Sequence, residues 1–257
     1  MIKSAQEFLR FIFRVAPIDY LYPTDCVLCG KDGVDGVCED CELSFARVDF
    51  PFCVRCGKPL RQAYGTDSCS ECAGRWKHVD RARSILIYQG GAREVLHKFK
   101  YQRRAGLGKY FASLLNRTYP NMQKLSLYFN WDLNEQPSLI VPIPIHPFKK
   151  LIRGFNQNEL VLEYSSVKRE IPINVSLVVR KKFTRSQVGL PENKRFENVH
   201  DAFVVNPRLS QLVEGKSVLL FDDLITTGAT INSAARALKQ AGTKHVFALS
   251  LFTASNI

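Results

Sequence analysis

The chain has 257 residues, of which 46% are hydrophobic and 23% are charged, and its formal net charge is +12. These are ordinary values for a folded globular protein, so they exclude disorder, collagen and coiled coil. Its apolar stretches, such as Val246–Phe252, are far shorter than the ~20 residues that span a bilayer, and the start of the chain has no uninterrupted signal-peptide core. We therefore expect a soluble, cytoplasmic protein without membrane insertion.

Eight cysteines, all between residues 26 and 72, form four Cys-x-x-Cys pairs. Two thiolates three residues apart on a tight turn can bind one ion, and tetrahedral Zn²⁺ takes four such sulfurs. Glycine follows the first and third pairs only, where a knuckle turn can require positive φ. This alternation predicts two consecutive zinc ribbons with one zinc each. The predicted ligands are Cys26, Cys29, Cys38 and Cys41 in the first ribbon and Cys53, Cys56, Cys69 and Cys72 in the second.

Two other arrangements of the cysteines stay open. An interleaved pairing, first pair with third and second with fourth, explains the alternation less well. Four disulfides would need an oxidising compartment, which the missing signal-peptide core argues against. So short a segment builds little core, and a structural zinc can supply about 10–16 kcal/mol of folding energy. We expect the zinc to be structural rather than catalytic.

From Arg81 the pattern changes to alternating strands and helices. Apolar spacing predicts a strand over Ser84–Tyr88 and helices over Arg93–Tyr101 and Leu107–Tyr119. The next segment, Tyr119–Glu135, is aromatic and irregular, and we expect it to be a surface excursion.

Positive charge is concentrated in this middle part of the chain. Residues 81–200 hold 21 basic and 8 acidic residues, a net charge of +13. Such a field attracts phosphates, although a solvated face is the simpler interpretation. In the densest run, basic side chains alternate with aromatic rings, a pattern that fits backbone charge plus base stacking. The predicted nucleic-acid patch consists of Lys98, Lys100, Tyr101, Arg103 and Arg104.

Short apolar runs predict the remaining strands, at Leu139–Ile145, Val175–Val179, Ala202–Val205, Val218–Phe221 and Val246–Phe252. Pro142 and Pro144 cannot donate to a sheet, so the first of these strands lies at an edge or ends there. Helices are expected over 158–167 and 231–240, and a mobile polar loop over 180–199. Strands that alternate with helices imply an α/β fold with a parallel sheet.

One stretch of the sequence indicates a ligand. Asp222 and Asp223 follow a buried strand, and the turn Thr226-Thr227-Gly228-Ala229-Thr230 then opens a helix. Open α/β sheets bind ligands beyond the carboxyl ends of their strands. The N–H groups, hydroxyls and helix N-terminus of this turn suit a phosphate monoester, and the carboxylates can accept hydrogen bonds from sugar hydroxyls. The stretch predicts a ribose 5-phosphate site, with an acidic N-cap that binds no ligand as the alternative.

Residues 218–230 resemble the phosphoribosyl pyrophosphate (PRPP) motif of type I phosphoribosyltransferases. The whole chain resembles the ComF family, which joins an N-terminal zinc ribbon to such a domain. The other matching positions are Val141–Pro147, Arg153–Gln157, Arg180, Thr184, Gln187, Leu190, Arg195 and Asn198. The resemblance implies an N-terminal helix and double zinc ribbon over residues 1–80. It implies a type I phosphoribosyltransferase-like domain, a parallel sheet flanked by helices, over residues 81–257.

The resemblance also implies roles for the site residues. Asp222 and Asp223 would hold the ribose 2′- and 3′-hydroxyls, and Thr226–Thr230 would hold the 5′-phosphate. Ile145 and His146 would lie in the pyrophosphate-side loop, with residues 180–198 as a flexible flap. Mg²⁺ would arrive bound to the pyrophosphate. No residue is assigned a catalytic role, since a lone histidine is more often structural.

Three functions fit these expectations. ComF relatives are associated with natural transformation, so the resemblance implies a PRPP pocket used in handling incoming single-stranded DNA, with other competence proteins as candidate partners. An active phosphoribosyltransferase of nucleotide metabolism or salvage is one alternative. A non-catalytic sensor of PRPP or a nucleotide is the other, because the fold alone does not decide between them. The sequence identifies no acceptor base.

Overall fold

The computed structural model describes residues 25–34, 36–49, 51–61, 69–70, 72–102, 104–181 and 201–254. The expected N-terminal helix, Arg103 and most of the expected flap (residues 182–200) lie outside the described residues.

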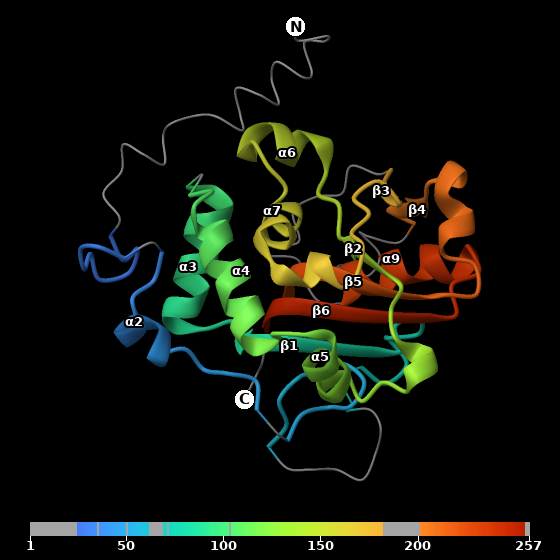
Figure 1. Ribbon diagram of the computed structural model, residues 1–257, viewed down its shortest axis with the longest axis horizontal. Coiled ribbons are helices and arrows are strands. Elements are labelled where there is room, and N and C mark those ends of the chain that lie inside the picture. Colours follow the sequence, from blue (N-terminus) through green and yellow to red (C-terminus); the bar gives the residue numbers. More distant parts are fainter. Residues whose placement is uncertain are drawn as a thin grey trace, which may run out of the picture.

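A four-stranded parallel sheet forms the centre of the molecule (Figure 1), as predicted. In spatial order its strands are β1 (Arg81–Ile87), β6 (His245–Thr253), β5 (Ser217–Ile225) and β2 (Leu139–Pro142). The long central pair runs in register from Ser217 opposite His245 to Ile225 opposite Thr253. Strand β2 lies at an edge and ends at Pro142, as the prolines predict.

Helices cover both faces of the sheet, because successive side chains of the central strands point to opposite sides and both sides are apolar. Leu219 and Phe221 of β5 belong to one core, whereas Val218 and Leu220 belong to the other. The first core is completed by α3 (Gly90–Tyr101), α4 (Leu107–Thr118), α5 (Met122–Phe129) and α7 (Gln157–Tyr164). The second core is completed by α9 (Ala229–Gln240).

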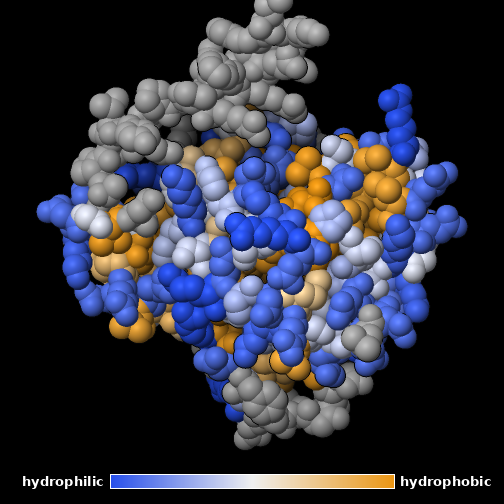
Figure 2. All heavy atoms as spheres, viewed as in Figure 1, coloured by the Kyte–Doolittle hydropathy of each residue, from blue (hydrophilic) through white to orange (hydrophobic). Residues whose placement is uncertain are grey.

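Smaller elements surround this framework. They are α2 (Glu39–Leu43), η2 (Leu133–Glu135), α6 (Pro147–Arg153), η3 (Ser166–Arg169), β3 (Val178–Arg180), β4 (Phe203–Val205) and η4 (Pro207–Leu212). Strands β3 and β4 pair antiparallel on either side of the expected flap. The face in Figure 2 is mostly hydrophilic, and hydrophobic side chains gather on it near β4 and η4.

The segment Tyr119–Glu135 is not a surface excursion, so that expectation was wrong. It forms α5 and η2, and Phe129 at the end of α5 is fully buried. The ring of Phe129 stacks on Trp131 with 4.5 Å between centroids, and both rings contact Phe247 of β6. The helix is only eight residues long and ends in the left-handed residue Asn130, so no extended helical spacing marks it in the sequence.

The cysteine-rich segment packs against the sheet domain. Its backbone extends the outer edge of β1, since Val48 N–H donates to the Ile85 carbonyl (3.0 Å) and Ala82 N–H donates to the Arg55 carbonyl (2.7 Å). Cys26 of the first ribbon lies in one core, and Trp76, which follows the second ribbon, lies in the other. The boundary between domains near residue 80 stays a prediction.

Within the described part of the chain, no helix is both long and apolar enough to cross a bilayer.

Candidate functional site

The eight cysteines form two clusters of four, in the consecutive arrangement predicted from the sequence. The clusters are Cys26, Cys29, Cys38, Cys41 and Cys53, Cys56, Cys69, Cys72, and the sulfurs of each lie within 4.8 Å of one another. The Cys29–Cys38 and Cys56–Cys69 sulfurs are 3.6 Å apart, far beyond a disulfide bond. Tetrahedral zinc with ~2.3 Å bonds places its sulfurs about 3.8 Å apart, so both clusters fit zinc.

The turns of the two clusters explain the alternating glycines. Gly30 and Gly57, which follow the first and third pairs, adopt φ of +74° and +70°. A Cβ at Gly57 would also overlap the carbonyl oxygen of Ala82 in β1. The second cluster is therefore held tightly against the sheet, and three of its four cysteines are at most 2% exposed.

The two aspartates of the PRPP-like stretch lie inside β5 and not after the strand as had been predicted. The strand continues to Ile225 because its pairing with β6 continues through Asp222 and beyond. Asp223 is 3% exposed and Asp222 is half-buried. Both carboxylates therefore need hydrogen-bond partners from the protein or from a ligand.

Asp223 has two polar partners from different helices. Lys100 at the end of α3 forms an ion pair with it, with 2.6 Å between Lys100 Nζ and Asp223 Oδ1. The Gln157 side-chain amide, at the start of α7, donates to the other carboxylate oxygen, and Arg153 in turn donates to Gln157. This network connects α3, α6 and α7 at the carboxyl end of β5.

Asp222 is held by amide donors. Asn158 Nδ2 donates to Asp222 Oδ1 (2.9 Å), and the Asp223 backbone N–H donates to the same oxygen (2.9 Å). The pKa of Asp222 is raised to about 7, chiefly by burial and also by the negative charge of Asp223, while the positive charge of Lys100 opposes the shift. A carboxyl group with this pKa is partly protonated at neutral pH.

Four cationic side chains surround the two carboxylates. Burial lowers the pKa of Lys149, and the positive charges of Arg180, Arg153 and Lys100 add to this shift. The Asp223 carboxylate attracts the Arg153 guanidinium, and the Asp222 carboxylate attracts the Arg180 guanidinium. The site therefore has more positive than negative side chains, which favours a polyanionic ligand.

The turn between α6 and α7 arranges these groups. Gly154 ends α6 at φ +87°, and Asn156 caps α7 by accepting from the Asn158 N–H (3.1 Å). The side chains of Asn156 and Asn158 both donate to the Ile143 carbonyl, which fixes the loop after β2 to α7. Residues 153–157 belong to the family resemblance but had no predicted role, and their polar, glycine-containing sequence was the available signal.

The predicted phosphate turn lies directly after β5. Gly228 adopts φ +80° and is the N-cap of α9, and the Thr227 hydroxyl accepts from the Ala229 N–H (3.4 Å). Thr226, Thr227 and Thr230 are half-buried. A twelve-residue helix that begins at such a turn presents the positive end of its dipole to an anion.

The expected pyrophosphate-side loop begins where β2 ends beside β5, with Pro142 opposite Phe221. Ile145 and His146 follow β2 and are half-buried. His146 is the N-cap of α6, where its Nδ1 accepts from the Phe148 N–H (3.1 Å). This is a structural role, and their contact with pyrophosphate stays a prediction.

The predicted nucleic-acid patch is divided by the fold. Lys98 forms an ion pair with Glu94 (2.8 Å) and also donates to the Val27 carbonyl, while Lys100 lies in the candidate site. Tyr101 is 57% exposed, with the Arg153 guanidinium over its ring at 5.7 Å. Arg104 is exposed, and Arg103 lies outside the described residues.

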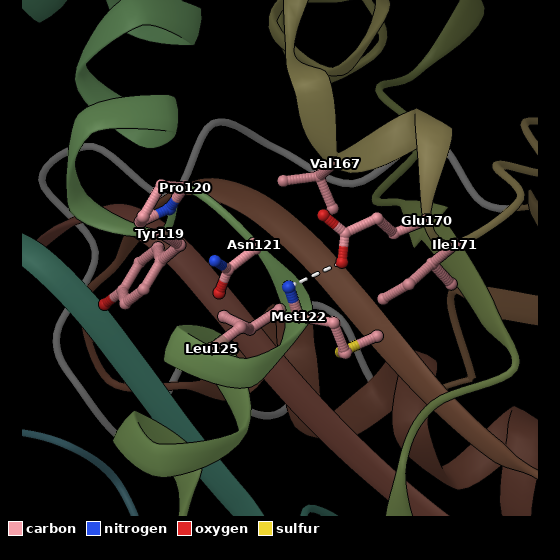
Figure 3. A pocket seen from close by; sticks show the side chains of 8 residues that line it. All are labelled: Tyr119, Pro120, Asn121, Met122, Leu125, Val167, Glu170 and Ile171. Atoms are coloured by element: carbon pink, nitrogen blue, oxygen red, sulfur yellow. Dashed lines mark hydrogen bonds between the residues drawn. The ribbon is translucent and has the colours of Figure 1, made fainter.

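A small hollow lies away from these groups, between α5 and η3 (Figure 3). It is lined by Tyr119, Pro120, Asn121, Met122, Leu125, Val167, Glu170 and Ile171. Among these lining residues the one charged side chain is Glu170, which accepts from the Met122 N–H and so ties α5 to the segment after η3. Because none of these lining residues is positively charged, the hollow is unsuited to a phosphate group.

Both the cysteine-rich segment and the sheet domain are similar to known protein families. The family model for a double zinc ribbon domain matches residues 17–73, and the model for a phosphoribosyl transferase domain matches residues 130–255. Competence protein F of Haemophilus influenzae is 28% identical over 215 residues, which cover 82% of this chain and 88% of that protein. The chain is therefore similar to ComF proteins in both of its parts.

Other relatives match over a similar length. Competence protein ComFC of Streptococcus pneumoniae is 28% identical over 218 residues, which cover 84% of this chain and 86% of that protein. The DNA utilization protein YhgH of Escherichia coli K12 is 26% identical over 223 residues, which cover 86% of this chain and 92% of that protein. The similarity thus spans the ribbons and the phosphoribosyltransferase domain together.

Proposed function

We propose that the carboxyl end of β5 binds PRPP or a related phosphoribosyl ligand, and that the protein uses this pocket in handling single-stranded DNA during natural transformation. One observation supports the phosphoribosyl pocket above all: three kinds of group meet at the end of β5. They are the two carboxylates, a glycine turn at a helix N-terminus and four cationic side chains. Each of these groups matches one part of a phosphoribosyl ligand.

The carboxylates match the sugar. Asp222 and Asp223 can accept hydrogen bonds from the ribose 2′- and 3′-hydroxyls, which are donors with a fixed separation. Asn158 and Gln157 orient these carboxylates before a ligand arrives. Preorganisation of this kind reduces the entropy lost on binding.

The turn and the cations match the two phosphate ends. The turn Thr226–Thr230 would receive the 5′-phosphate at the start of α9. Lys100, Lys149, Arg153 and Arg180 would balance the charge of the pyrophosphate. Mg²⁺ would enter with the pyrophosphate, because this ion keeps most of its waters and needs few protein ligands.

A role in DNA handling is supported by the relatives. Two of them are named competence proteins and a third a DNA utilization protein. The exposed ring of Tyr101 with the exposed Arg104 nearby in sequence fits stacking on a base beside a phosphate contact. We place the protein in the cytoplasm, where single-stranded DNA and competence proteins would be its partners.

Calorimetry with PRPP and Mg²⁺ tests the pocket. The wild type should release heat with one site per chain, and Asp222→Asn/Asp223→Asn should weaken binding by about tenfold or more, the effect of losing roughly 1.4 kcal/mol. Asp40→Asn, which changes an exposed ion pair in the first ribbon, is the matched control and should bind like the wild type. Equal heats from the wild type and the double variant would overturn the assignment.

Phosphoribosyl transfer is a second candidate function. It is favoured by the cations near Asp223, which could stabilise charge as pyrophosphate leaves the ribose C1 carbon. A screen of nucleobases for pyrophosphate release decides between transfer and binding alone. Release with a particular base identifies the acceptor, and no release with any base favours a protein that binds or senses the ligand.

A further inference from the structure

The indole of Trp76 lies directly against the phosphate turn. Trp76 is 2% exposed, and its Nε1–H donates to the Thr227 carbonyl at 3.0 Å. A Cβ built on Gly228 would overlap the indole ring. Gly228 is therefore required both by its positive φ and by the closeness of this ring.

The hydrogen bond sets the direction of one peptide. In a trans peptide the C=O and N–H bonds point in opposite directions. Because the Thr227 carbonyl points towards the indole, the Gly228 N–H points away from it. This N–H belongs to the turn that would hold the 5′-phosphate.

Trp76 is in turn connected to the second cysteine cluster. Its backbone N–H donates to the Cys72 carbonyl (3.1 Å), and the sulfur of Cys72 lies 3.7 Å from that of Cys53. Two residues after Trp76, the His78 N–H donates to Asn232 Oδ1 of α9 (3.1 Å). The segment between the cluster and β1 thus contacts both the turn and the helix that follows it.

We propose that Trp76 is the positioning residue of the phosphate turn, and that the metal-loaded second cluster holds it there. This inference rests on the proposed phosphoribosyl site, to which it adds a residue outside the phosphoribosyltransferase sequence motif. The first cluster packs in the opposite core with α3 and α4, and should have no such effect.

Backbone hydrogen exchange without ligand tests the positioning directly. Trp76→Phe removes the hydrogen bond and keeps most of the ring, so amides of residues 226–230 should exchange about tenfold faster, the effect of one hydrogen bond of roughly 1.4 kcal/mol. Trp131→Phe, which alters the other tryptophan in the opposite core, should leave these amides unchanged. Unchanged exchange of residues 226–230 in Trp76→Phe would overturn the proposal.

Variants of the two clusters test the metal link. Cys72→Ser should lower the zinc content by one equivalent and speed exchange of the turn, whereas Cys29→Ser should lower the zinc content equally and leave the turn unchanged. If both variants speed exchange equally, the second cluster has no specific link to the turn. Zinc content and the thermal midpoint identify any variant that has unfolded, and Trp76→Phe remains the deciding variant in that case.

Tryptophan emission links the turn to its ligand. The chain has two tryptophans, so Trp131→Phe leaves Trp76 as the single reporter. Its emission should shift when Mg²⁺ and PRPP are added, and Trp76→Phe should bind PRPP about tenfold more weakly, as expected for one lost hydrogen bond. If the wild type does not bind PRPP at all, the proposed function fails, but the exchange experiment still decides the role of Trp76.

Discussion

Lys100 and Asp223 form an ion pair with 2.6 Å between Nζ and Oδ1, and it joins the densest basic run of the chain to the acidic PRPP-like stretch. The Lys100 side chain is 17% exposed and the Asp223 side chain 5%. A lysine expected to contact nucleic acid therefore lies in the candidate phosphoribosyl site. There it can balance Asp223 before a ligand arrives and contribute positive charge towards an anion.

Lys100→Met should lower the free energy of unfolding by about 2–4 kcal/mol, because it leaves a buried carboxylate without its cation. Asp223→Asn should also destabilise, because it leaves the lysine without its anion. The loss of unfolding free energy in the double variant, measured by urea unfolding, should be at least about 1 kcal/mol smaller than the sum of the losses in the two single variants.

An exposed pair provides the control for this cycle. Lys31 Nζ and Asp40 Oδ2 are 3.0 Å apart, but the two side chains are 59% and 76% exposed. Lys31→Met should therefore lower the free energy of unfolding by less than about 1 kcal/mol. Additive effects of Lys100→Met and Asp223→Asn would show that the two residues do not interact in solution.

Asp222 should make the stability depend on pH. Its pKa is raised to about 7 by burial, so the folded protein retains a proton that the unfolded chain releases near pH ~4. The stability of the wild type should therefore fall between about pH 4 and pH 7 relative to Asp222→Asn. Each unit of pKa difference corresponds to about 1.4 kcal/mol.

Urea unfolding of both proteins across this range measures the effect. The free energy of unfolding of Asp222→Asn minus that of the wild type should grow with pH and level off above about pH 7, where Asp222 has lost its proton in the folded protein as well. The variant is a suitable reference because an asparagine side chain at this position can still accept from Asn158. A difference that stays constant, or that falls as pH rises, contradicts a raised pKa for Asp222.

The two cysteine clusters should differ in their effect on stability. Cys72→Ser changes a cluster that lies largely in the core, whereas Cys29→Ser changes an exposed ligand of the other cluster. Each variant should lose one of two zinc equivalents, measured by elemental analysis, and Cys72→Ser should show the larger drop in thermal midpoint. The reverse order would contradict the closer integration of the second cluster.

Single-stranded DNA binding should depend on salt if the basic run contacts phosphates. The combined change of Lys98, Arg103 and Arg104 to Ala, which leaves the Lys100–Asp223 ion pair intact, should flatten the slope of log K against log salt. Tyr101→Phe should preserve the affinity and Tyr101→Ala should lower it, because stacking needs only the ring. An unchanged slope would remove these residues from the DNA interface.

The cysteine spacing and the PRPP-like stretch could be interpreted from the sequence because each is local. Metal ligands at fixed spacing, and glycines at positive φ such as Gly30 and Gly57, depend on neighbours in the chain. Pro142 likewise ends an edge strand for a local chemical reason.

The contacts that complete the site were not predictable, because they join distant segments. Lys100 is 123 positions before Asp223, and Trp76 is 151 positions before Thr227. Nothing in the local spacing of α5 showed that Phe129 and Trp131 would pack on β6. Such pairings follow from the order of strands in the sheet, which short-range patterns do not specify.

The central claim is that the turn after β5 holds the 5′-phosphate of a phosphoribosyl ligand. Amide NMR of the ¹⁵N-labelled protein tests it most directly, because a phosphate accepted by the turn must shift the N–H signals of that turn. On addition of Mg²⁺ and PRPP, we expect the signals of Thr227, Gly228 and Ala229 to move in a saturable way, and to move much less in Asp222→Asn/Asp223→Asn. Signals that stay in place at saturating ligand would contradict the account.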